Sequence, residues 1–87
     1  MTVNKMVERL QKRNEYNLSF DEVIKLCFAV IKQHTDVIEQ SRAAVILSGI
    51  VKKGLGKRTL RFLKKNPKLP GRVHELLNAA FMRMECF

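Results

Sequence analysis

The sequence predicts an all-α protein: a compact bundle of about five short helices around a central apolar helix at residues 20–34. Three observations support this prediction. Apolar residues recur at the i, i+3, i+4 and i+7 spacing of a helix face along most of the chain. No segment shows the period-two alternation of a strand. Helix-start and helix-stop signals separate the periodic segments. At 87 residues, the chain is predicted to form one domain spanning 1–87.

The first periodic segment begins at the N-terminus. Val3, Met6, Val7 and Leu10 follow helical spacing and predict a helix that ends around residues 14–17. The Lys and Arg residues of this segment fall on its other faces. We interpret them as a solvent-exposed surface.

The central helix has the clearest start signal. Ser19 and Glu22 form a capping-box pattern, and Leu18 and Val23 stand at the positions of a hydrophobic staple. Residues 20–34 are then apolar over most of the helix circumference, so this helix is expected either in the centre of the core or at a contact with a second copy. A second group of apolar residues, Met82, Met84 and Phe87, lies near the C-terminus. Together with the apolar surface of residues 20–34, this group predicts a homodimer.

A third helix is predicted from a cap at Asp36 to about Lys53. Gly49 within it suggests a close helix crossing, and Gly54 fits the C′ position that ends a helix. The apolar residues of this helix are Val37, Ile38, Ala44, Val45, Leu47, Ile50 and Val51.

Two further helices complete the count. After a tight turn at residues 54–56, residues 57–65 predict a fourth helix with Leu60 and Leu63 facing the core. Pro70 stands near the first position of the last helix, where proline is favoured. That last helix has a regular apolar stripe of Val73, Leu76, Leu77, Ala80, Phe81 and Met84.

The positive charge of the chain is concentrated in one block. The net charge is +9, yet residues 40–74 contain ten Lys or Arg and no Asp or Glu, while residues 1–39 are neutral. On the fourth helix, five basic residues occupy one arc of about 120° at about 100° per residue. The candidate binding residues are Lys52, Lys53, Lys57, Arg58, Arg61, Lys64, Lys65, Lys68 and Arg72.

A localised basic surface of this kind is typical of proteins that bind nucleic acid through its phosphates. Helix three, the glycine turn and helix four could form a helix-turn-helix. The basic arc of helix four, however, carries no Asn, Gln or Ser to read bases. Recognition of shape and backbone is therefore favoured, with RNA, possibly double-stranded, slightly ahead of DNA. Tyr16 is the one aromatic residue expected at the surface, which gives base stacking little support.

Two alternatives stay open. The basic face could dock an acidic surface of a partner protein, which would make the protein an interaction adaptor. It could also bind an anionic membrane. Residues Pro70–Leu77, PGRVHELL, resemble the Pro-Gly-Arg-Val segment that opens a late helix in deltaretroviral matrix proteins, which are small, helical and basic. The resemblance covers eight residues. Thr2 stands where that family carries a myristoylated glycine, and the family's N-terminal tryptophan is absent.

The remaining function classes lack their sequence signatures. Gly56-Lys57 is followed by Arg58 rather than Ser or Thr and is not preceded by a strand, so it is not a phosphate-binding P-loop. His34 and His74 have no partners at metal-ligand spacing. We therefore expect no enzyme activity, no metal and no cofactor. The N-terminal residues lack the apolar region of a signal peptide, which predicts a cytoplasmic or nuclear protein. Cys27 is expected in the core.

Overall fold

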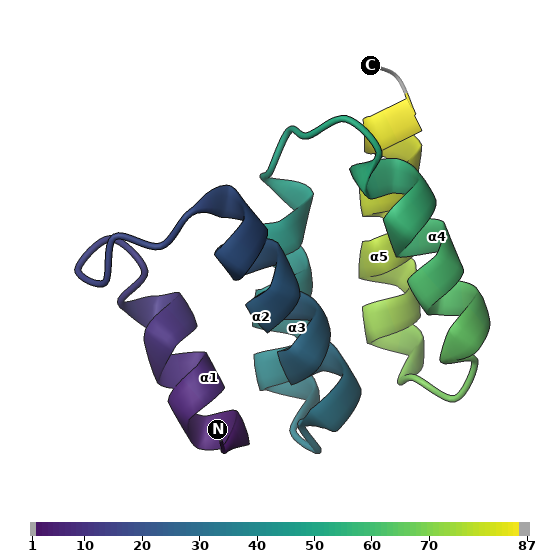
Figure 1. Ribbon diagram of the computed structural model, residues 1–87. Helices are drawn as coiled ribbons and strands as arrows, with labels where there is room; N and C mark the ends of the chain where they lie inside the picture. The colour runs from purple at the N-terminus through teal and green to yellow at the C-terminus, as the bar shows by residue number, and fades with distance from the viewer. Residues whose placement is uncertain (1, 86–87) are drawn as a thin grey trace.

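The computed structural model describes residues 2–85 and contains five α-helices within them (Figure 1). They are α1 (Val3–Gln11), α2 (Phe20–Gln33), α3 (Val37–Ser48), α4 (Leu55–Lys65) and α5 (Gly71–Glu85). No strand occurs in this part of the chain. The prediction of an all-α bundle is confirmed. Phe87, which was named with Met82 and Met84 for the expected homodimer, lies outside the described residues.

The helices pack as neighbours in space. α1 lies against α2, α2 against α3, α3 against α5, and α5 against α4 (Figure 1). α2 therefore lies between α1 and α3, and α4 and α5 form a hairpin at the opposite side of the bundle from α1. This arrangement leaves one long side of α4 open to solvent, and the basic residues of α4 lie on that side.

Three of the helices begin with a side-chain cap. The Ser19 hydroxyl accepts a hydrogen bond from the Glu22 N–H at 3.3 Å and donates to the Glu22 carboxylate at 3.2 Å, so the predicted capping pair is present. Asp36 accepts from the Ile38 N–H at 2.9 Å, and Thr2 caps α1 in the same way. These contacts satisfy N–H groups that have no partner within the helix.

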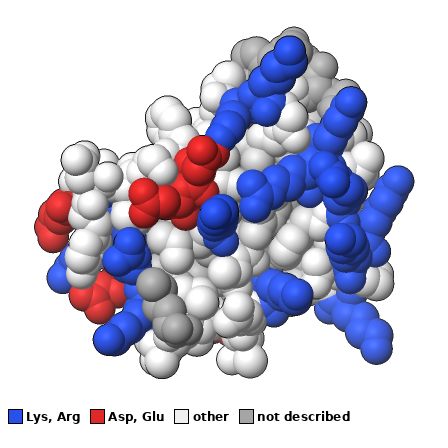
Figure 2. All heavy atoms as spheres, viewed as in Figure 1, with Lys and Arg blue, Asp and Glu red and all other residues white. Residues whose placement is uncertain are grey.

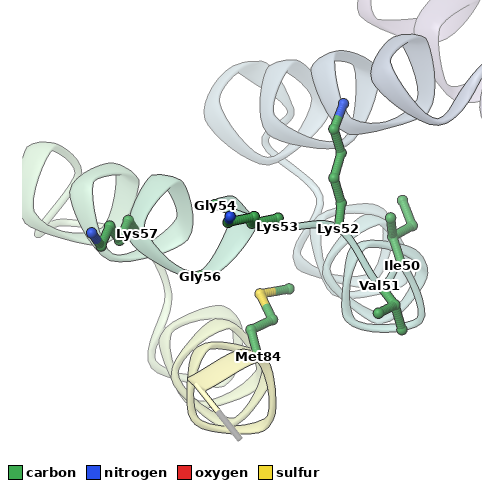
Figure 3. Close-up of a pocket in the computed structure, with 8 residues that line it drawn as sticks. All are labelled: Ile50, Val51, Lys52, Lys53, Gly54, Gly56, Lys57 and Met84. Carbon is green, nitrogen blue, oxygen red and sulfur yellow. The ribbon is translucent and has the colours of Figure 1, made fainter. Parts of the chain in front are cut away.

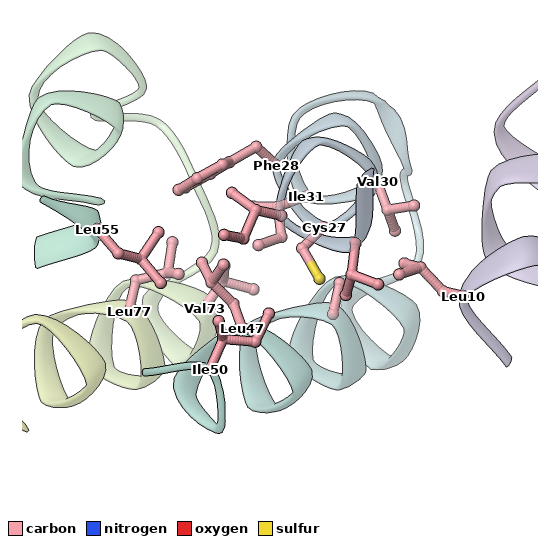
Figure 4. Packing of buried hydrophobic residues seen from close by; sticks show 14 of the residues in the cluster. Leu10, Cys27, Phe28, Val30, Ile31, Leu47, Ile50, Leu55, Val73 and Leu77 are labelled. Atoms are coloured by element: carbon pink, nitrogen blue, oxygen red, sulfur yellow. The ribbon is translucent and has the colours of Figure 1, made fainter. Parts of the chain in front are cut away.

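The core confirms the central place of α2 (Figure 4). Its buried residues belong to one hydrophobic cluster with side chains from α1, α3, α4 and α5, and Cys27 is fully buried, as predicted. The predicted central position does not extend to the first residue of the helix, Phe20, whose side chain is 68% exposed. Residues 19–22 are all exposed, so the first turn of α2 lies at the surface of the bundle rather than in its centre.

The predicted end of the third helix is wrong. α3 ends at Ser48 with Gly49 as its cap, and residues 50–53 are not helical. Gly54, at a φ of 86°, is the N-cap of α4 and not the C′ residue of α3. Ile50 and Leu55 are both buried, so the non-helical residues between them connect two core positions, one after α3 and one in the first turn of α4.

The expected turn at residues 54–56 is also shorter than predicted, because Leu55 and Gly56 are buried within the first turn of α4. Gly49 is exposed, and the only neighbour that a side chain there would meet is the Ile46 carbonyl oxygen at 3.5 Å. No helix crosses at Gly49, so that prediction is wrong as well.

α3 has apolar residues on two opposite faces and buries only one of them. The buried residues are Gln40, Ala43, Ala44 and Leu47. Four of the apolar residues in the predicted third helix are exposed: Val37, Ile38, Val45 and Val51. The polar side chain of Gln40 can be buried because its amide N–H donates a hydrogen bond to the carbonyl of Ile31, in the last turn of α2, at 2.9 Å.

Candidate nucleic-acid interface

The pattern of α4 positions the basic residues. Leu55, Thr59 and Leu63 recur every four residues and are buried, so the opposite side of the helix faces solvent. The Thr59 hydroxyl is satisfied inside the core by the Leu55 carbonyl at 2.9 Å. The exposed side carries five cations: Lys57, Arg58, Arg61, Lys64 and Lys65. Figure 2 shows Lys and Arg gathered over the side of the molecule that α4 occupies, with acidic residues on the side of α1 and α2.

Arg58 is held in place by an aromatic pair. Its guanidinium lies 5.2 Å from the centre of the Phe28 ring, and the Phe28 and Phe62 rings are 4.7 Å apart at 40°. A cation at this distance from an aromatic face is attracted by the ring. The Phe28–Phe62 contact also joins α4 to α2, so the two rings fix both the helix and one of its cations.

These groups form a shallow hollow of about 340 Å³ lined by Phe28, Arg58, Arg61, Phe62 and Lys65. Phe28 and Phe62 were not among the predicted site residues. Phe62 could have been found from its position at the edge of the basic arc, next to Arg61. Phe28 could not, because it comes from α2, and only the packing of α2 against α4 brings it to this surface.

A second hollow, of about 430 Å³, lies at the N-terminal end of α4 (Figure 3). Gly54 caps the helix without a side chain, and the Arg58 N–H already bonds to the Gly54 carbonyl at 3.2 Å. The Gly56 and Lys57 N–H groups thus lie at the open end of the helix, where no intrahelical acceptor exists. Lys53 and Lys57 line the same hollow. An anion here would meet backbone donors, the helix dipole and two lysines together.

Lys52 differs from the other predicted residues because it is paired. Its ammonium forms an ion pair with the Asp21 carboxylate in the first turn of α2. In Figure 3 its side chain accordingly points away from Lys53 and Lys57. Within the described residues, no other member of the predicted set forms an ion pair. Lys52 thus links the segment before α4 to α2 rather than adding a free charge.

Arg72 lies apart from the α4 surface. It is exposed on the first turn of α5 and lines a different hollow, together with residues of α3. Lys68 is exposed in the connection between α4 and α5. The structure therefore brings six of the nine predicted residues into one region at α4 and places Lys68 at its end. Lys52 borders the hollow at the N-terminus of α4 but is paired with Asp21, and Arg72 lies apart. We call the five α4 cations with Lys53 and Lys68 the α4 basic surface.

Comparison of the chain with protein-family models, with curated proteins and with solved structures finds no match. Other site types also find little support in the described part of the chain. No group of three or more His, Cys, Asp and Glu is placed to hold a metal ion there. None of the described helices has the length and apolar character that crossing a bilayer requires.

Proposed function

We propose that the protein binds nucleic acid through the α4 basic surface, contacting phosphates, with RNA slightly favoured over DNA and with a regulatory, non-catalytic role. One observation carries this proposal: five exposed cations occupy a single side of α4 and are not neutralised by any described acid. Cations arranged in this way displace counterions from a phosphate backbone, which is the main source of sequence-independent affinity.

The size of α4 allows a rough number of contacts. Lys57 and Lys65 are separated by eight residues, or about 12 Å along the helix axis at about 1.5 Å per residue. Phosphates of one duplex strand recur every 3.4 Å or so along the axis, so this row matches about three or four of them. The open N-terminus of α4, with Lys53 beside it, could add a further phosphate.

Recognition of the backbone is favoured over recognition of bases. The exposed side of α4 offers only Lys and Arg, and its one hydroxyl residue, Thr59, is fully buried. Phe28 is mostly buried and already lies against Arg58, so it presents no free ring for a base to stack on. A surface of cations without base-reading groups is suited to the shape of a duplex, above all A-form RNA. Such a role would place the protein in the cytoplasm or the nucleus.

The proposal is tested by fluorescence anisotropy with labelled single-stranded RNA, duplex RNA and duplex DNA of equal length, over a series of salt concentrations. We expect binding that weakens steeply as salt rises, with duplex RNA bound best. The variant R61A/K64A/K65A should lose affinity for all three probes. Its plot of log K against log salt should become shallower by up to about 2.7 for duplex DNA and about 2.1 for single strands.

A matched control removes three exposed cations elsewhere. K5A/K25A/K32A lowers the net charge by the same amount but changes α1 and α2 only. It should keep most of the affinity and most of the salt dependence. Absence of binding to every probe at low salt would refute the proposal, as would equal losses in the two triple variants. Binding to anionic vesicles but to no oligonucleotide would favour the membrane alternative instead.

The homodimer stays a separate prediction, and one of the two observations that led to it, the apolar surface of α2, no longer supports it. α2 was expected to share its apolar surface with a second copy, but α1, α3 and α4 cover that surface within one chain. Met84 is half-buried, and its sulfur lies 3.7 Å from the Thr59 hydroxyl oxygen. Sedimentation equilibrium that shows only a 10.1 kDa species at high concentration would contradict the dimer.

A further inference from the structure

A third hollow, of about 620 Å³, lies between α3, α5 and the segment after α1. Aliphatic side chains form its floor, and three arginines also line the hollow. The residues that form it are Arg13, Val37, Ile38, Ser41, Arg42, Val45, Ile46, Arg72 and Leu76. None of them belongs to α2 or α4, so this groove is distinct from the α4 basic surface. We call it the α3–α5 groove.

The exposed face of α3 is unusual for a surface helix. Ile38 and Val45 lie one heptad apart and are 58% and 56% exposed, with Ser41 between them on the same face. The opposite face of α3 carries the buried residues, so this helix is apolar on both sides. Exposed apolar side chains that line one groove, and are not scattered singly, are typical of a binding surface. The small Ser41 side chain leaves room for another helix to approach.

The charges around the groove indicate the chemistry of its partner. No Asp or Glu is among the described residues that line it. Arg13 is fixed at the end of α1 because its guanidinium donates to the Leu10 carbonyl at 2.7 Å. Arg42 is paired with Glu39 at 2.9 Å, whereas Arg13 and Arg72 are in no described ion pair. An occupant with carboxylates beside its apolar residues would therefore match both the floor and the arginines.

We propose that the α3–α5 groove docks an amphipathic helix of an acidic partner protein. Apolar residues of that helix, three and four apart, would cover Ile38, Val45 and Leu76, while flanking Asp or Glu residues meet the arginines. Helix-in-groove recognition of this kind uses i, i+3, i+4 and i+7 anchors. The aliphatic floor holds no aromatic side chain on which a base could stack, so nucleic acid is the poorer match.

A second copy of the chain is also a poorer match. In a two-fold dimer the same patch meets itself, so the three arginines of one groove would face those of the other. Each chain carries a net charge of +9, and juxtaposed like charges oppose association. An acidic partner removes this repulsion and replaces it with attraction.

The test uses the full chain labelled with ¹⁵N and an acidic amphipathic peptide of about 18 residues, or about five helical turns. Two control peptides are matched to it: one has the same composition with its apolar face scrambled, and one has each Glu replaced by Lys. We expect amide shifts to change on α3 and α5 with the acidic peptide. The scrambled and Lys-containing peptides should bind about tenfold more weakly or not at all.

The variant I38S/V45S should weaken the acidic peptide by about tenfold or more and remain folded, because both side chains are exposed. Arg72→Glu should weaken it as well, through charge rather than apolar contact. R61A/K64A/K65A, which lies outside the groove, should bind the peptide about as tightly as the unmodified chain. This last comparison separates the groove from the α4 basic surface.

Three results would overturn the proposal. The first is amide shifts confined to α4, which would show general attraction of an acidic peptide to a basic protein. The second is equal binding of the scrambled peptide, since the apolar floor would then contribute nothing. The third is a dimer in sedimentation equilibrium that I38S/V45S abolishes, because a second copy would then occupy the groove.

Discussion

Two apolar residues of α3 have opposite roles in the structure, and substituting each by alanine tests the packing directly. Leu47 is fully buried, beside Ile50, Val73 and Leu77 in the core (Figure 4). Val45, two residues earlier, is 56% exposed on the other side of the helix. Both belong to the apolar residues of the predicted third helix, and only the tertiary structure distinguishes them.

The expected free-energy changes differ widely. Leu47→Ala removes buried methyl groups and leaves a cavity, which costs about 2–5 kcal/mol. Domains are stable by about 0.05–0.15 kcal/mol per residue, which for a chain of this length is about 4–13 kcal/mol in total. The substitution therefore removes a large part of the stability. At about 4–8 °C per kcal/mol, a loss of about 3 kcal/mol lowers the Tm by about 12–24 °C.

Val45→Ala should instead be neutral or slightly stabilising. Its side chain loses little contact, and alanine is a better helix former than valine by a few tenths of a kcal/mol or so. Urea and thermal unfolding followed by far-ultraviolet circular dichroism measure both variants, with the slope of unfolding free energy against urea as a check on two-state behaviour. Equal destabilisation by the two substitutions, or a larger effect of Val45→Ala, would refute the placement of α3 in the core.

Three further predictions test single contacts. Ser19→Ala should lower the free energy of unfolding by about 1 kcal/mol, because the cap of α2 is lost, while Ser19→Asp should change it little; urea titration checks both. Asp21→Asn should release Lys52 and steepen the salt dependence of duplex DNA binding by up to about 0.9, and an unchanged slope would contradict this. Burial raises the pKa of the Cys27 thiol from 9.0 to about 12, with the charge of Arg13 acting in the opposite direction. The folded protein thus keeps a proton that the unfolded chain loses near pH 9. Its free energy of unfolding should fall, relative to that of Cys27→Ala, by about 1.4 kcal/mol per pH unit above pH 9. A difference that stays constant between pH 8 and 10 would contradict this.

Local signals in the sequence were sufficient for much of the fold. The capping pair at Ser19 and Glu22 marked the start of α2, because the Ser19 hydroxyl accepts from the Glu22 N–H and donates to the Glu22 carboxylate wherever the helix lies. The apolar stripe of α5 predicted its buried side, with Val73, Leu77 and Ala80 in the core. These features depend on neighbours along the chain, so a sequence without an alignment is enough to find them.

The candidate site was predictable in part for the same reason. The five cations of α4 share one side of a single helix, and helical spacing alone places them there. Their exposure then follows from burial of Leu55, Thr59 and Leu63 on the other side. Lys52 and Arg72 were grouped with them only because they are close in sequence. In space, Lys52 pairs with Asp21, and Arg72 lies in the α3–α5 groove.

The sequence by itself therefore determined the number and order of the helices, the caps that start α2 and α3, the central position of α2 and the row of cations on α4, since each depends on residues within one or two helical turns. Only the tertiary structure decided where α3 ends, which of its two apolar faces is buried, and which cations are paired. Those outcomes depend on contacts between residues far apart in the chain. The apolar pattern of α3 fits burial of either face, and packing against α2 and α5 selects the face with Leu47 and leaves Ile38 and Val45 in solvent.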